Sequence, residues 1–200
     1  MKLLMESWRR YLLTESIDPR IMKQIDKAEE MGCKVYAIDK GDYGFAEIVQ
    51  GEPGSYKFTT IAKVSWTAND GTFGECNHAG WVQASTAHDG LGPLAYDIAM
   101  EQLGGLMSDR TEVSDEAEAV WQAYMDSRKD VKQDQLDIHK DYDLPQLTPD
   151  NPDDDCDQIP ATQKYKGDWS KSALSKVFYK QGTPVMTELE RRGMLETKLP

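Results

Sequence analysis

The stretch AHDGLGPLAYDIAM, residues 87–100, decides how the fold is interpreted. Gly90 and Gly92 stand one residue apart and are followed by Pro93 and an apolar run with helical spacing. Glycine lets backbone approach a ligand closely, and proline suits the first helical position. Free N–H groups at a helix start attract phosphate or carboxylate. The stretch therefore predicts either an anion-binding loop or a plain strand-to-helix turn, and the absence of G-x-G-x-x-G and Gly-Lys-Ser/Thr excludes Rossmann and P-loop sites.

Four segments before this loop are predicted to be β-strands. Each is rich in β-branched and aromatic residues and is bounded by Gly, Asp, Asn or Pro. They span residues 34–39, 43–50, 56–67 and 79–86. The short connection between the first two strands favours an antiparallel meander.

After the loop, the pattern predicts a helix over 93–103 and a strand over 104–109. Ser114 is a good N-cap for a second helix with an acidic first turn. The fold class predicted from this order is a mixed α/β sheet, in which antiparallel strands lead to a parallel fourth and fifth strand flanked by helices.

The last third of the chain gives weaker signals. Residues 133–145 are ambiguous and are interpreted as one more helical turn, and the polar stretch 141–170 as an ordered surface loop or a linker. A late strand in 172–180 and a helix over 184–195 complete the order. We divide the chain into N-terminal helices (1–32), a core (33–130), and a polar loop with a C-terminal extension packing on the core (131–200).

Two helices are predicted before the first strand. Residues 3–15 form an amphipathic pattern, and Asp18 before Pro19 is typical of an N-cap with a first-turn proline. Within the first helix, Leu13-Thr14-Glu15 resembles the L-x-E sites cut by phage prohead proteases. An ordinary helix docked on the sheet is the favoured interpretation.

Composition restricts the classes of function. The net charge of −12 lacks the basic footprint of a nucleic-acid binder, and no apolar run is long enough to cross a bilayer. Cys33, Cys76 and Cys156 are scattered, which predicts a reducing, cytoplasmic compartment without a disulfide framework or a zinc site. The acidic stretch 150–157 lacks EF-hand spacing, so we expect an exposed, solvated loop and no metal site.

The loop and its context resemble the GNAT N-acetyltransferase superfamily. The family signature Q/R-x-x-G-x-G/A covers residues 87–92, where both glycines match and Ala87 replaces Gln or Arg. A second family pattern falls on Ser114, Ala117, Val120 and Trp121 with the same spacing. The resemblance covers about residues 79–127, and extends to 34–67 only through strand order.

The resemblance implies transfer of an acyl group from acetyl-CoA to an amine-bearing substrate, either a small molecule or a protein. Trp121 stands where the family often has a general-acid Tyr, so Tyr124 is the candidate acid, with Glu47 as the candidate base. The residues expected to contact the coenzyme are Val82, Ala84, Thr86, His88, Asp89, Gly90, Leu91, Gly92, Pro93 and Leu94.

A second function class stays open: a non-catalytic GNAT-like protein, encoded by a bacteriophage, that contacts a virion component or a host protein. Ala87, Asp89 and Trp121 favour it, since each departs from the enzyme pattern. Asp109 and Arg110 follow the fifth strand, and we interpret them as a surface ion pair rather than as substrate ligands.

Overall fold

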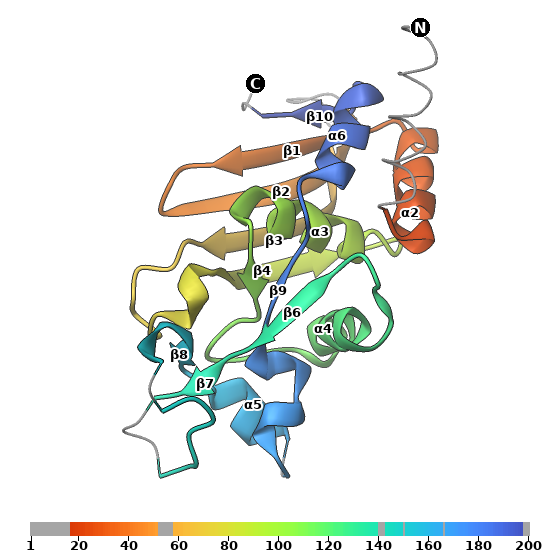
Figure 1. Cartoon of the computed structure of the whole chain (residues 1–200). Coiled ribbons are helices and arrows are strands. Elements are labelled where there is room, and N and C mark those ends of the chain that lie inside the picture. Colours follow the sequence, from red (N-terminus) through yellow and green to blue (C-terminus); the bar gives the residue numbers. More distant parts are fainter. Residues whose placement is uncertain (1–16, 52–57, 140–142, 150, 166, 198–200) are drawn as a thin grey trace, which may run out of the picture.

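The computed structural model describes residues 17–51, 58–139, 143–149, 151–165 and 167–197 (Figure 1). Its helices are α2 (Pro19–Glu30), α3 (Gly92–Leu103), α4 (Asp115–Ser127), α5 (Ile159–Lys164) and α6 (Pro184–Arg191). Short 3-10 turns span Cys76–His78 (η1), Pro152–Asp154 (η2), Trp169–Lys171 (η3) and Ala173–Ser175 (η4). The strands are β1 (Cys33–Asp39), β2 (Tyr43–Gln50), β3 (Thr59–Thr67), β4 (Gly80–Ala87), β5 (Leu106–Met107), β6 (Lys132–Gln135), β7 (Asp137–Ile138), β8 (Asp155–Cys156), β9 (Lys176–Tyr179) and β10 (Leu195–Glu196).

A mixed sheet runs through the molecule (Figure 1). Within the described residues it has eight strands in the order β10-β1-β2-β3-β4-β5-β9-β6. Strands β1 to β4 are antiparallel neighbours, whereas β4 and β5 are parallel, as are β1 and β10. β7 and β8 form a separate parallel pair. The mixed α/β class is confirmed.

Helix α3 supplies the centre of the core. Leu94, Ile98 and Met100 are fully buried, together with Ile48 and Val64 of the sheet. The sequence predicts this helix because its apolar residues recur on more than one face, as expected for a helix that is covered on several sides. Burial of such side chains stabilises a fold by about 1.5–3 kcal/mol each.

Local cap signals are confirmed. Asp18 Oδ1 accepts the Arg20 N–H at 2.8 Å at the start of α2, and Ser114 Oγ accepts the Ala117 N–H at 3.2 Å at the start of α4. Gly193 ends the last helix with a φ of 67°. The short polar side chains satisfy N–H groups that a helix leaves without intrahelical partners.

The final third differs from its prediction. The helical turn expected in 133–145 is wrong, because residues 132–135 are strand β6 and residues 137–138 are strand β7. The polar stretch 141–170 contains η2, β8, α5 and η3. β6, β9 and β10 extend the sheet at its two ends.

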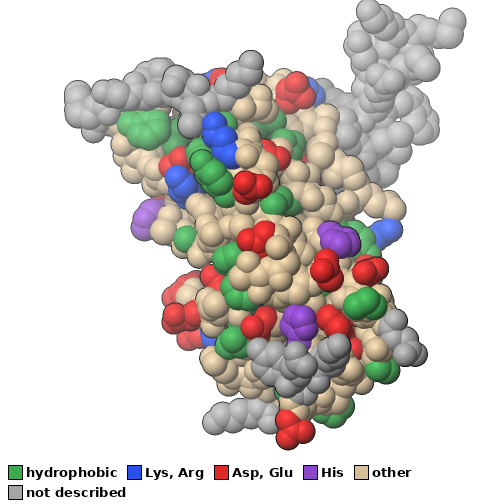
Figure 2. Space-filling model, turned by 90° about the vertical axis from the view of Figure 1, so that its left-hand side faces the viewer, with side chains coloured by type: hydrophobic (Ala, Val, Ile, Leu, Met, Phe, Trp, Pro, Cys, Tyr) green, Lys and Arg blue, Asp and Glu red, His purple; other side chains and the backbone are tan. Residues whose placement is uncertain are grey.

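The predicted helix over residues 3–15, with its L-x-E site, lies outside the described residues. In the part of the chain that the structure describes, no helix is long and apolar enough to cross a membrane. On the face shown in Figure 2, Asp and Glu side chains spread over the lower half, where few Lys or Arg side chains appear.

Candidate functional site

The parallel strands β4 and β5 separate soon after they pair. Their register contains only Gly80 opposite Leu106 and Trp81 opposite Met107. β5 ends there, whereas β4 continues to Ala87 along β3 (Figure 1). From the residue after Trp81 onward, the β4 edge that faces away from β3 pairs with no strand in the described chain. The predicted parallel pairing of the fourth and fifth strands is confirmed.

A cavity of about 330 Å³ lies beside this open edge. Its opposite wall is the segment 109–114 that follows β5, and Tyr96 of α3 and Trp121 of α4 also line it. The β4 wall consists of Val82, Gln83, Ala84 and Ser85. Two residues proposed to contact the coenzyme, Val82 and Ala84, are therefore cavity residues.

A second cavity, of about 260 Å³, lies between the end of β4 and the glycine loop. Thr86, Ala87 and Gly92 line it, with Glu116 of α4. The side chains common to both cavities are Ser85, Tyr96, Ser114 and Ala117. Since they share these walls, the two cavities adjoin along β4. We call the two cavities together the β4 channel.

The backbone of β4 offers hydrogen-bonding groups to this channel. The His88 N–H donates to the Ile61 carbonyl of β3 at 2.8 Å, and this bond fixes the phase of the antiparallel ladder. Alternate residues along β4 therefore direct their N–H and C=O groups toward β3, and those between them toward the open edge. The residues facing the open edge are Ser85 and Ala87. An extended ligand with amide groups can pair with such an edge.

The β4 ladder also contains a bulge. Ser65 of β3 pairs with Ala84, and the next residue, Trp66, pairs with Val82. Gln83 is therefore an extra residue on β4, at the point where the channel widens beside β5. A bulge of this kind bends the strand and increases its twist.

The glycine loop has only part of the conformation that its sequence predicts. Asp89 and Gly90 have φ values of 55° and 72°, whereas Gly92 is not in the left-handed region. A Cβ added to Gly92 would lie 3.1 Å from the Ala87 Cβ. The first glycine thus serves the turn, and the second leaves room beside the channel. Leu91 is fully buried and is not among the residues that line the channel.

Helix α2 holds this loop from outside. Gln24 Oε1 accepts the Leu94 N–H at 2.9 Å, and Lys27 Nζ donates to the Asp89 carbonyl at 2.5 Å. The Leu94 N–H therefore already has a side-chain acceptor. Within the described chain, the N–H groups without an acceptor in this stretch are those of Asp89, Gly90 and Gly92.

Tyr96 places a hydroxyl group in the channel. Its OH donates to Ser85 Oγ at 2.8 Å, and its ring packs edge-on against Trp121 with centroids 5.3 Å apart. Burial raises the pKa of Tyr96, and the hydrogen bond to Ser85 opposes this rise. Sequence reasoning missed this residue because the family patterns do not include it.

The two predicted catalytic side chains lie elsewhere. The Tyr124 OH donates to Asp97 Oδ1 at 2.8 Å, and burial followed by the Asp97 charge raises the pKa of this tyrosine well above its usual value. Glu47 accepts from Thr60 Oγ1 at 2.7 Å and faces Lys63 Nζ at 3.4 Å on the sheet. Neither is among the residues that line the channel.

Tyr124 belongs to a buried ionic network between α3, α4 and β9. Asp97, which is fully buried, contacts Arg128 Nη2 at 2.6 Å and Lys180 Nζ at 2.9 Å. Lys180 also contacts Glu101 at 2.9 Å. A hollow of about 560 Å³ opens over this network, but its buried charged group, Lys180, is already paired. The ion pairs of this network hold α3, the end of α4 and the end of β9 together.

The expectation that Asp109 and Arg110 form a surface ion pair is wrong. The Arg110 side chain is fully buried, and it donates to the Leu174 carbonyl at 2.8 Å and to the Asp157 carbonyl at 3.2 Å. Burial lowers the pKa of Arg110 to about 10, while the charges of Asp157 and Asp109 oppose this shift. Asp109 Oδ1 instead accepts the Thr111 N–H at 2.7 Å and shapes the channel wall.

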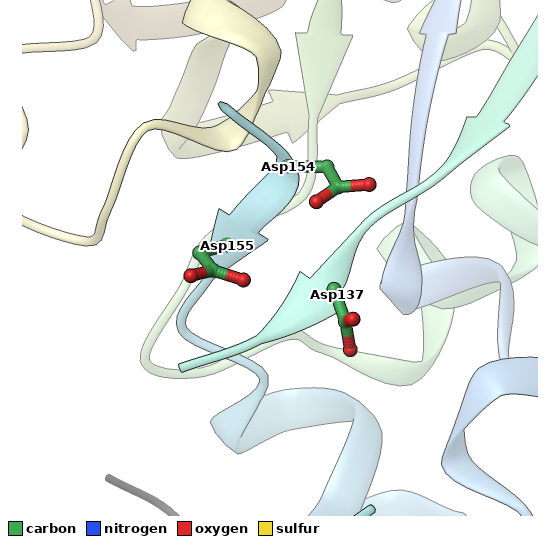
Figure 3. Close-up of side chains that lie close together, drawn as sticks. All are labelled: Asp137, Asp154 and Asp155. Carbon is green, nitrogen blue, oxygen red and sulfur yellow. The ribbon is translucent and has the colours of Figure 1, made fainter. Parts of the chain in front are cut away.

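The expectation of an exposed acidic loop at 150–157 is also wrong. Asp154 is buried, and one oxygen of each of Asp137, Asp154 and Asp155 lies within 4.8 Å of the others (Figure 3). Thr148 Oγ1 lies within 3.0 Å of carboxylate oxygens of both Asp137 and Asp154. Burial would raise the pKa of Asp137, but N–H donors from Leu147 and Thr148 lower it. The cluster fastens the 144–148 loop to β7.

A disulfide joins Cys76 and Cys156, which contradicts the prediction of unpaired cysteines. It connects the segment between β3 and β4 to β8. Cys33 is free and buried, and burial together with the Asp89 charge raises the pKa of its thiol. The argument for a reducing compartment from scattered cysteines therefore no longer holds.

Comparison with protein-family models, with curated proteins and with solved structures gives no match for this chain. Functional inference therefore rests on the geometry of the β4 channel.

Proposed function

We propose that this protein is a GNAT-like acyltransferase that moves an acyl group from a coenzyme A thioester, such as acetyl-CoA, to an amine. The observation that carries the proposal is the β4 channel, which follows an open strand edge from the glycine loop to the point where β4 and β5 separate. A thioester of coenzyme A has an extended chain with amide groups and a pyrophosphate at one end, so its shape and polarity suit this channel.

The backbone supports such a ligand at both ends of the channel. The N–H groups of Asp89, Gly90 and Gly92 would hold the pyrophosphate, and the positive end of the α3 dipole adds to their attraction. Ser85 and Ala87 would pair with the amides of the pantetheine chain through the open edge. These contacts would involve backbone atoms, so they would not require the family's Gln or Arg at position 87.

The charged side chains that line the channel are all carboxylates in the described chain: Asp109, Glu112 and Glu116. A protonated amine is attracted to such a wall, whereas an anionic acceptor is repelled. The acceptor is therefore a cationic amine, and the exposed Glu112 is the carboxylate best placed to receive the proton that the attacking amine loses.

The same acidity weakens coenzyme binding in a way that can be measured. Asp89 stands in the loop, so its charge opposes a pyrophosphate. Replacing Asp89 by Asn keeps the shape and removes one like charge, so affinity for coenzyme A should rise by about 1 kcal/mol, roughly fivefold. The gain should shrink at high salt, because salt screens the repulsion between exposed charges.

Calorimetric titration with coenzyme A tests this proposal. Gly92→Val should abolish binding, because its side chain starts 3.1 Å from Ala87 Cβ and fills the space beside the loop N–H groups. Asp42→Asn is the matched control, since Asp42 is an exposed aspartate in the β1–β2 turn that lines neither cavity. No measurable binding by the wild type and by Asp89→Asn alike would reject the enzyme. It would leave the alternative of a non-catalytic GNAT-like protein that acts through contacts with a virion or host protein.

A further inference from the structure

The channel contains a directed pair of hydroxyl groups. Tyr96 reaches it from α3 and Ser85 from β4, and both residues line both cavities. The Tyr96 OH donates to Ser85 Oγ at 2.8 Å. Tyr96 is 3% exposed, whereas Ser85 is exposed. The pair therefore runs from the protein interior to the solvent-accessible space of the channel.

In the structure, the Tyr96 OH is the donor of this pair and Ser85 Oγ is the acceptor. A tyrosine hydroxyl has one proton, and the Tyr96 proton lies on the bond to Ser85. The Ser85 hydroxyl has a proton of its own, for which the described residues supply no acceptor. That proton is available to a ligand in the channel. Donation by Tyr96 polarises the Ser85 hydroxyl and makes it a stronger donor.

We propose that Tyr96 and Ser85 form a proton relay to the sulfur of the thioester, an inference that rests on the proposed function. The amine nitrogen forms a bond to the acyl carbon, and the carbon–sulfur bond breaks with its electron pair on sulfur. Ser85 gives its hydroxyl proton to that sulfur and receives the Tyr96 proton in turn. The proton that the amine loses passes to Glu112 or water, and transfer from solvent restores Tyr96.

Two neighbouring aromatic side chains do not offer this step. The Trp121 indole donates a hydrogen bond but does not release its proton, and the Tyr124 OH is bonded to Asp97 outside the channel. Because burial raises the pKa of Tyr96, this group keeps its proton at neutral pH until the sulfur takes one. The relay supplies the acid that the tryptophan at position 121 cannot.

The test measures the thiol of bound coenzyme A, so that it does not depend on knowing the acceptor. Thiolate absorbance in the ultraviolet is recorded against pH for coenzyme A bound to the wild type, Ser85→Ala and Tyr96→Phe. A donor to the thiolate lowers the thiol pKa, and its loss should raise that pKa by about one unit in both variants. Tyr179→Phe is the matched control, because its hydroxyl bonds Asp134 on β6 and lines neither cavity.

The outcomes separate the two proposals. Coenzyme A that binds each variant with wild-type affinity and shows an unchanged thiol pKa would overturn the relay and leave acyl transfer standing. A wild type that does not bind coenzyme A would overturn acyl transfer, and the relay with it. With acetyl-CoA and a polyamine as acceptor, we expect both variants to lose roughly 100-fold in kcat while their coenzyme affinity stays within twofold. Ser85→Ala alters an exposed position, so it reports on the relay even if Tyr96→Phe perturbs folding.

Discussion

Reduction of the Cys76–Cys156 disulfide should lower the free energy of unfolding substantially. The two cysteines are separated by 80 positions in sequence, so the bond closes a long loop in the unfolded chain. The chain-entropy relation gives about 4.5 kcal/mol for a loop of that length at 25 °C.

This loss of stability arises from the greater freedom of the reduced unfolded chain, because other bonds also hold the two linked segments together in the folded protein. The Asp157 N–H donates to the Phe73 carbonyl at 2.8 Å, and Gly74 pairs with Cys156 through a backbone bridge. These bonds keep the two segments together whether or not the sulfur atoms are joined. The reduced protein should therefore keep its fold and lose stability.

Urea unfolding with and without reductant measures the effect. With a slope of about 2.5 kcal/mol per molar urea, the midpoint should fall by roughly 2 M on reduction. A variant with Cys76→Ala and Cys156→Ala provides the control, since reductant should not move its midpoint. Titration of thiols in the unfolded, unreduced wild type should find one, that of Cys33. Three thiols, or equal midpoints with and without reductant, would refute the cross-link.

Two further predictions concern buried charge. Asp97→Asn removes the fully buried carboxylate that contacts both Arg128 and Lys180, which then share, among the described residues, only the contacts with Asp130, so it should cost about 3–5 kcal/mol in urea unfolding. A loss below about 0.5 kcal/mol, close to RT, would exclude a structural role for this network. The Arg191 and Arg192 guanidinium groups lower the pKa of Glu188 from 4.5 to about 2 against the effect of burial, so this carboxylate contributes stability above pH 4.5 that is lost as the pH falls toward 2. Acid titration of unfolding should show up to about 3 kcal/mol of this loss in the wild type and not in Glu188→Gln, and parallel curves would contradict the assignment.

The elements that the sequence predicts well are those with local physical causes. Asp18 and Ser114 cap helices because their short side chains reach N–H groups two or three residues on. The first four strands carry β-branched and aromatic residues that suit a half-buried sheet. Strand β6 was not predictable in this way, because KQDQ (132–135) is polar throughout and is held by backbone pairing with β9. Tertiary pairing determined its conformation.

The site was predictable in its backbone and not in its side chains. A glycine at position 90 indicates a positive φ, and the order of strand, loop and helix places Gly90 just after the end of β4. Contacts between distant segments decide the rest. The sequence shows Trp121 and Tyr124 on nearly the same helix face, but only the fold reveals that Asp97 of α3 accepts the Tyr124 hydroxyl. Likewise, Arg110 is buried where Leu174, 64 residues later, and Asp157 supply carbonyl acceptors.

Several polar interactions hold the elements around the β4 channel, and this placement bears on function. The wall formed by residues 109–114 is fixed through Arg110, whose guanidinium binds two carbonyls from the C-terminal third. The α4 side is fixed through Arg128 and Asp97, and the loop end through Gln24 and Lys27 of α2. Burying charges of this kind is costly, and helix-on-sheet packing alone does not require it. A channel with independently held walls loses little freedom when a ligand enters, which is the property that a binding site needs and a passive turn does not.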